Sequence, residues 1–220
     1  MKDIILEKIM KSSYELLINK GIRDISVQDI VKHANISTRT FYRYLKSKEE
    51  VINRIIKTGL ERNKSVLKML NTEVKNPIDA YVIFISTTFS GVKNMSTKFY
   101  IDLVKYYPEQ FNLINNFIFK DIQGFYIEMI NECKKLGLFR KEINSKFSAM
   151  YIVETNFNSL FKLFLNGKDF NKEFVFLELH RTLAYGMCTK KGIERFKIAA
   201  KNYFPALIDM GMPVNKAKDK

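Results

Sequence analysis

The hydrophobic and polar positions of this chain repeat with the period of an α-helix along almost its whole length. Apolar residues recur in steps of three and four, the spacing of one helix face. The longest such run covers residues 109–136, and no segment alternates with the two-residue period of a strand. Glycines and prolines interrupt the pattern at a few points, where helices are expected to end. The pattern therefore predicts an all-α fold.

Three short helices are predicted near the N-terminus. The first covers residues 4–20 and ends at Gly21, a residue type that favours helix C-termini. The second covers residues 27–34 and begins after Ser26, a good N-cap. The third covers residues 38–45.

A tight turn joins the second and third of these helices. Asn35 tolerates the left-handed conformation that a helix end often needs, and Ser37 is an N-cap for the helix that follows. This arrangement is typical of a helix-turn-helix, whose second helix reads DNA. The alternative is an ordinary helical hairpin whose solvated face happens to be basic.

The outward side chains of the third helix are hydroxyls, guanidinium groups and phenols, and none is acidic. Arginine can form two hydrogen bonds with guanine, threonine contacts bases, and tyrosine and lysine contact phosphates. The residues predicted to read the DNA sequence are Thr38, Arg39, Thr40 and Arg43. The residues predicted to anchor phosphates are Ser26, Tyr42, Tyr44 and Lys48, and Gln28 is a further predicted DNA contact.

Longer helices follow. One of about 23 residues begins at Lys48, and its length implies that it leaves the DNA-binding unit and enters the next domain. We therefore expect a helix-turn-helix domain over residues 1–47 and a larger helical domain over 48–220. Apolar residues of a helix predicted over 146–166 form one stripe that includes Phe147, Met150, Phe157, Phe161 and Phe164. The other predicted helices cover residues 78–92, 96–107, 109–136, 172–185 and, near the end, 193–203.

The composition of the chain favours an anionic partner and argues against several classes of protein. The net charge of +14 favours an anionic partner, although a general enrichment in lysine accounts for part of it. Cys133 and Cys188 have neither metal-ligand spacing nor a disulfide framework, which fits a reduced, cytoplasmic setting. The stretch 80–92 is too short to span a bilayer, so no membrane partner is expected. No catalytic triad, carboxylate pair or phosphate loop emerges, so we expect no enzyme, cofactor or metal.

Several residues occur in the order and spacing of a known family: Leu16-Leu17, Gly21, Ser26, Ile30, Asn35-Ile36-Ser37, Thr40-Phe41-Tyr42 and Ser47-Lys48-Glu49. Residues 9–56 thus resemble the N-terminal domain of the TetR family of transcriptional regulators. Arg39 stands where a small residue is frequent in that family, and Arg43 and Tyr44 stand where an aromatic residue and His are frequent. The two arginines add capacity for reading guanine.

The resemblance implies an all-helical homodimer that binds a palindromic operator on double-stranded DNA. Its dimer interface would be a four-helix bundle formed by the helices over about 146–166 and 172–186. A small-molecule effector would bind in the second domain, tilt the long helix and change the spacing of the two recognition helices. We therefore expect a ligand-responsive regulator, and a repressor that is released when the effector binds.

The second domain is rich in aromatic residues, for which core packing is the simpler interpretation. A carboxylate among aromatics can pair with a cationic ligand, as Asp121 and Glu154 would. Either one can equally pair with a lysine across the dimer or face solvent. The predicted pocket residues are Phe84, Phe99, Phe117, Asp121, Phe125, Glu154, Phe157 and Phe161.

Two other functions stay open at this point. One is a basic, architectural protein that binds DNA without sequence specificity, with a steep salt dependence. The other is a helical small-molecule-binding protein that has kept the helix-turn-helix without binding DNA. Retention of Tyr42, Lys48 and the two arginines speaks against the second.

Overall fold

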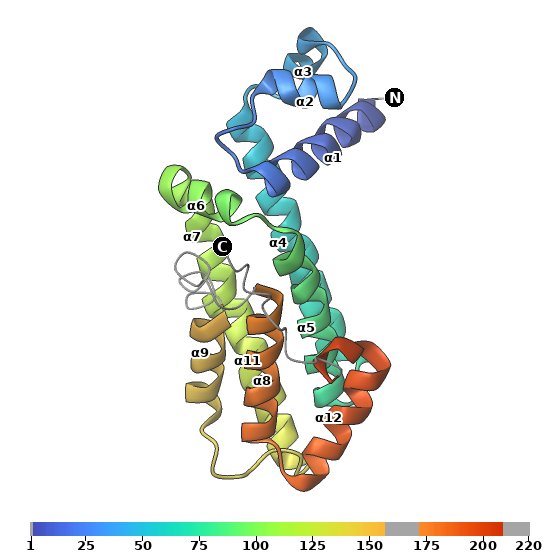
Figure 1. Cartoon of the computed structure of the whole chain (residues 1–220), viewed down its shortest axis with the longest axis vertical. Helices are drawn as coiled ribbons and strands as arrows, with labels where there is room; N and C mark the ends of the chain where they lie inside the picture. Colours follow the sequence, from blue (N-terminus) through green and yellow to red (C-terminus); the bar gives the residue numbers. More distant parts are fainter. Residues whose placement is uncertain (1, 157–171, 209–220) are drawn as a thin grey trace, which may run out of the picture. The chain divides into compact units, whose positions relative to one another are not determined.

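The structure, a computed structural model, describes residues 2–156 and 172–208. Nearly all of the described residues are helical and none forms a strand, although an isolated antiparallel bridge joins Phe139 and Cys188. The predicted all-α fold is confirmed. The elements are α1 (Lys2–Lys20), α2 (Val27–His33), α3 (Thr38–Tyr44), α4 (Lys48–Glu73), α5 (Pro77–Asn94), α6 (Thr97–Tyr106), α7 (Pro108–Phe117), the π-helical turn η1 (Ile118–Ile122), α8 (Gln123–Lys135), α9 (Ser145–Glu154), α11 (Lys172–Met187), α12 (Lys190–Tyr203) and the 3₁₀ turn η3 (Pro205–Leu207) (Figure 1).

The chain forms two compact units. Unit 1 comprises Met1–Lys64 and Asn94–Phe117, and unit 2 comprises Ser65–Lys93 and Ile118–Lys220. Helices α6 and α7 therefore pack with the helix-turn-helix region. The predicted domain boundary after residue 47 stays a prediction.

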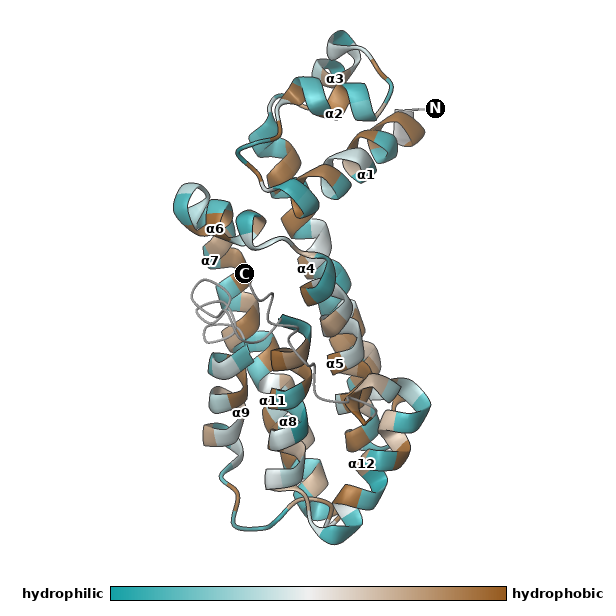
Figure 2. Cartoon of the chain, viewed as in Figure 1, coloured by the Kyte–Doolittle hydropathy of each residue, from teal (hydrophilic) through white to brown (hydrophobic). Residues whose placement is uncertain are grey.

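The core of unit 1 is formed by the apolar faces of its helices, each of which also carries hydrophilic residues (Figure 2). Helix α1 ends as predicted, because Gly21 has a φ of +92° that other residue types rarely adopt. Asn35 has a φ of +49°, which is the left-handed conformation expected of it. Fully buried residues of this core include Ile9, Leu17, Ile30, Phe41 and Ile52.

The single helix predicted over residues 109–136 is interrupted. Helix α7 ends at Phe117, five residues form the π-helical turn η1, and α8 begins at Gln123. A π turn adds a residue to the helical ladder without ending the helix, so an apolar pattern in steps of three and four does not reveal it. The interruption adjoins the border of the units, since Phe117 belongs to unit 1 and Ile118 to unit 2.

Helix α9 begins where it is predicted, because the side chain of Asn144 accepts a hydrogen bond from the backbone N–H of Phe147 at 3.0 Å. The first residues of its predicted apolar stripe lie on the outer side of the helix. Phe147 and Met150 are 61% and 43% exposed, so they do not line the core of unit 2. The buried side of α9 consists of Ala149, Ile152 and Val153. Residues 157–171, with the rest of the predicted stripe and helix, lie outside the described residues.

Candidate functional site

Two capped helices form the helix-turn-helix. Ser26 and Asp29 make a reciprocal capping box: the N–H of Asp29 donates to Ser26 Oγ at 3.2 Å, and the N–H of Ser26 donates to Asp29 Oδ2 at 2.8 Å. The hydrogen bonds from the side chain and backbone of Ser26 lower the pKa of Asp29. Ser37 caps α3 by accepting from the N–H of Thr40 at 3.0 Å. Together with the left-handed Asn35, these caps determine where each helix begins.

Three long side chains of α3 are exposed and extend from a helix whose position is set by these caps. Arg39, Tyr42 and Arg43 are exposed, and the guanidinium of Arg43 lies 5.3 Å from the ring centre of Tyr44. Tyr44 itself is half-buried. These residues present two guanidinium forks and a phenol together, which suits base edges and phosphate oxygens.

The two threonines of α3 are less accessible than the arginines. Thr38 and Thr40 are half-buried, and both hydroxyls already have local partners. Thr38 Oγ1 donates to Gln28 Oε1 at 3.4 Å, and Thr40 Oγ1 lies 2.8 Å from Ser37 Oγ. DNA contacts by these side chains would therefore exchange one hydrogen bond for another.

Lys48 occupies an unexpected environment. Its ammonium donates to the carbonyl oxygens of Ile22 and Ile25 at 3.0 and 2.8 Å. Burial lowers the pKa of Lys48. Two of the three ammonium protons are thus used inside unit 1, so Lys48 positions the α1–α2 loop whether or not it also contacts phosphate.

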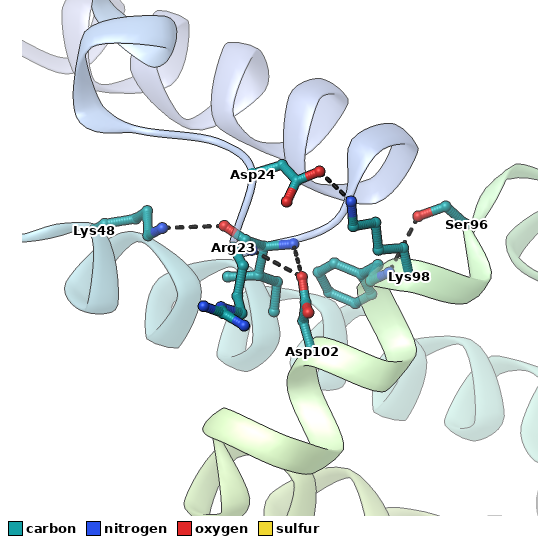
Figure 3. Close-up of polar contacts among 8 residues, drawn as sticks. Arg23, Asp24, Lys48, Ser96, Lys98 and Asp102 are labelled. Atoms are coloured by element: carbon teal, nitrogen blue, oxygen red, sulfur yellow. Dashed lines mark hydrogen bonds and ion pairs between the residues drawn. The ribbon is translucent and has the colours of Figure 1, made fainter.

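Asp102 of α6 holds the same loop from the other side, as Figure 3 shows. Its Oδ2 accepts hydrogen bonds from the backbone N–H groups of Ile22 and Arg23, both at 2.8 Å. Lys98, also on α6, forms an ion pair with Asp24 of the loop. The loop that leads into α2 is therefore clamped by charged side chains from α4 and α6.

Sequence reasoning missed this clamp. Asp102 lies 80 positions from its partner Ile22, and no local pattern connects the two. One signal was available: Phe99, Asp102 and Leu103 share the buried side of α6, so a carboxylate stands on an apolar helix face. A buried carboxylate requires hydrogen-bond donors, and here the loop N–H groups supply them.

The predicted pocket residues do not come together as one group. Phe84 and Phe125 meet in unit 2, with ring centres 5.1 Å apart, and both are buried. Phe99 lies in the core of unit 1. Phe117 belongs to unit 1 as well. A surface hollow in unit 2 is lined by residues of the 136–138 segment and of α12, and includes none of the predicted pocket residues.

The two candidate carboxylates also differ in environment. Asp121 is half-buried in η1, whereas Glu154 is exposed near the end of α9. Glu154 therefore does not lie in the aromatic core, because it occupies the outer side of α9. Phe157 and Phe161 lie outside the described residues.

Comparison with known proteins decides the family. Residues 9–55 match the family model described as bacterial regulatory proteins, tetR family. Residues 9–55 thus have the sequence of a tetR-family N-terminal domain. The predicted resemblance of residues 9–56 is thereby confirmed, and the matched family is one of regulators and not of enzymes, as predicted. No curated protein sequence matches the chain.

Solved structures extend the likeness in fold to nearly the whole length of the chain. A gamma-butyrolactone receptor described as ArpA-like aligns with a TM-score of 0.66 and 12% identity, covering 94% of this chain and 100% of that one. The ketosteroid transcriptional regulator KstR2 of Mycobacterium tuberculosis aligns with a TM-score of 0.60 and 15% identity, covering 84% and 95%.

A regulator from Saccharomonospora viridis, solved in complex with choline, aligns with a TM-score of 0.68 and 13% identity over 86% of this chain and 100% of that one. At such identities these structures show a shared fold. Among the described residues of the chain, no helix is both long and apolar enough to cross a membrane.

Proposed function

We propose that this tetR-family protein is a ligand-responsive repressor that binds a palindromic operator as a homodimer and leaves it when a small molecule binds unit 2. The observation that carries the proposal is the exposed face of α3. Arg39, Tyr42 and Arg43 project from a short helix capped at its start, with the basic residues free to reach a major groove. A protein with this role works on chromosomal DNA, so we place it in the cytoplasm.

The roles of the DNA contacts follow from their environments. Arg39 and Arg43 are the best placed for base edges, since each offers a bidentate fork to guanine. Tyr42 is 54% exposed and suits a phosphate. The hydroxyls of Ser26, Thr38 and Thr40 have local partners, so their DNA contacts are secondary in this proposal.

Exposed apolar side chains on α9 support the homodimer. The rings of Phe147 and Tyr151 are stacked with centres 6.4 Å apart, and Met150 is exposed beside them in the sequence. Isolated exposed apolar residues are common, but a group of them on one helix indicates an interface. Tyr185 on α11 is exposed as well. A second copy of the chain, bound through α9 and α11, is the proposed occupant of this face.

The aromatic core of unit 2 supports the effector role. Phe84, Phe125 and Tyr126 are buried and in mutual ring contact, and aromatic side chains of this kind commonly line small-molecule sites. The structurally similar Saccharomonospora viridis protein was solved with choline, a small molecule. We propose by analogy that unit 2 accepts a small-molecule effector.

Selection of binding sites from random DNA duplexes tests the proposal. A palindromic site should emerge for the wild-type protein, because a dimer presents two recognition helices. Arg39→Ala should then lose about 1–3 kcal/mol of binding free energy at one base position and tolerate other bases there.

Lys57→Ala is the matched control, since it removes one exposed cation from α4 outside the helix-turn-helix. It should keep the selected sequence unchanged. If the wild-type protein selects no sequence, and binds all duplexes with the same steep salt dependence, it is a non-specific DNA-binding protein and the proposal is wrong.

A further inference from the structure

Unit 2 contains a buried amide without a hydrogen-bond partner among the described residues. Asn156 is 6% exposed, and neither its nitrogen nor its oxygen has a partner. The other buried polar side chains in the described part of unit 2 each have a partner: Asp79 pairs with Arg195 through Oδ2, although its Oδ1 has none, and His180 lies 2.8 Å from Tyr81. Buried polar groups are nearly always satisfied, so a full amide left unpaired calls for an explanation, and a ligand is one.

The position of Asn156 can be read from the helix pair that it follows. It comes directly after α9, which packs along α8 and against η1. Ser145 Oγ donates to Asn131 Oδ1 at 2.6 Å, so the start of α9 lies beside the C-terminal part of α8. The residues that follow α9 therefore lie toward η1, at the other end of α8.

Both helices leave α geometry in this region. Residues 118–122 form the π turn η1, and residues 155–156 are π-helical as well. Such turns are rare in proteins and occur frequently at functional sites. The π turns are an observation independent of the unpaired amide, and both point to the same end of the helix pair.

We propose that Asn156 is the polar anchor of the effector site and binds an uncharged, largely apolar molecule that carries an adjacent donor and acceptor, as in a lactam or a primary amide. A carboxamide side chain offers two donors and one acceptor, and such a group satisfies both of its ends. The inference rests on the proposed function, because it names the ligand class of the proposed effector site.

The charged groups in the described part of unit 2 explain why the ligand is uncharged. A buried anion or cation is stable only beside an opposite charge. Asp79 and Arg195, the buried acid of described unit 2 and its partner, already neutralise each other. Asp121 is half-buried in η1 and would serve a cationic ligand, for which Asn156 would be unnecessary. A neutral amide-like group is the ligand that needs Asn156.

The test uses the full-length protein and the variant Asn156→Leu, which keeps the side-chain size and removes both polar groups. The probes are 2-quinolinone, ε-caprolactam and benzamide, with benzoate and choline as anionic and cationic comparisons. Thermal unfolding and calorimetry provide the melting temperature and the Kd. At least one amide probe should raise the melting temperature of the wild type, and its Kd should be about tenfold weaker for Asn156→Leu.

The ligand-free variant should unfold at the same temperature as the wild type or higher, since it no longer buries an unpaired amide. Asn202→Leu, the same change at an exposed position of α12, should bind the probes like the wild type. The proposal is wrong if no amide probe stabilises the wild type, if Asn156→Leu responds equally, or if benzoate or choline stabilises more strongly. DNA selection without probes reports on the proposed function separately, so the two failures can be distinguished.

Discussion

At the scale of single residues, charged side chains from two helices set the geometry of the loop before α2. Asp102 accepts from the N–H groups of Ile22 and Arg23, while Lys48 donates to the carbonyls of Ile22 and Ile25. Peptide groups outside helices need such partners when they are buried. The loop therefore depends on two ionised groups, and its orientation determines where α2 begins.

Replacing Asp102 tests this dependence. Asp102→Asn should lower the free energy of unfolding by about 1–3 kcal/mol, because two N–H groups then face a neutral and partly donating amide. Urea unfolding followed by circular dichroism measures the loss. Asp24→Asn is the control: its ion pair with Lys98 is half exposed, so the unfolding midpoint should change little. Equal losses in the two variants would contradict the role given to Asp102.

His180 predicts a pH dependence at the same scale. Burial lowers the pKa of its imidazole to about 3, whereas the unfolded chain takes up the proton near the ordinary value of 6.5. Because the folded pKa is the lower one, the stability from the neutral ring is complete above the unfolded pKa. It is lost as the pH falls, at about 1.4 kcal/mol per pH unit.

The measurement is urea unfolding of the wild type and His180→Gln between about pH 7 and pH 4, the window in which the unfolded histidine becomes charged. The stability difference between the two proteins should shrink with falling pH, since carboxylates titrate in both. A constant difference for His180→Gln would show that His180 is not buried in its neutral form.

At the scale of elements, the first turn of α12 packs unusually close to the connector after α8. The N–H of Thr189 donates to Leu138 O at 2.9 Å, and a Cβ on Gly192 would lie 1.9 Å from that same oxygen. That distance is far inside van der Waals contact, and the obstacle is backbone rather than a flexible side chain. The packing of α12 on this connector therefore requires glycine at position 192.

The corresponding variant is Gly192→Ala. It should destabilise unit 2 by roughly 1–3 kcal/mol, because backbone must move to admit the methyl group. Gly186→Ala in α11, where a Cβ would meet no atom within 4 Å, should be neutral or stabilising, since alanine favours helices. The melting temperatures of both variants measure these effects. If Gly192→Ala were as stable as the wild type, the backbone at Leu138 would not lie as close to position 192 as the structure places it.

At the scale of the whole molecule, the proposed dimer depends on the apolar face of α9. Phe147→Glu should give a monomer, because a buried carboxylate at the interface would have no partner. A monomer occupies only one half-site, so operator affinity should fall by roughly 100-fold. Light scattering measures the mass, and fluorescence anisotropy with the selected duplex measures the affinity.

Ile198→Glu on α12 provides the control for this prediction. Ile198 is also exposed, and it lies on a helix outside the proposed interface. This variant should remain a dimer and bind the operator normally. If Phe147→Glu remains a dimer too, the interface does not include this face of α9.

The sequence by itself determined the helical class, the helix-turn-helix and the ends of the helices around it. Ser26 and Ser37 cap as predicted, and Gly21 and Asn35 adopt the positive φ expected at helix ends. These features depend on interactions among residues only a few positions apart. Short-range periodicity and capping residues are therefore enough to predict these features.

Only the tertiary structure decided which helix faces meet. It placed Phe99 in unit 1, turned Phe147 outward and brought Asp102 onto a loop 80 positions away. It also revealed η1, whose extra residue leaves the apolar period intact. An apolar stripe shows that a face is buried without showing against what, because that choice is made by the packing of distant helices.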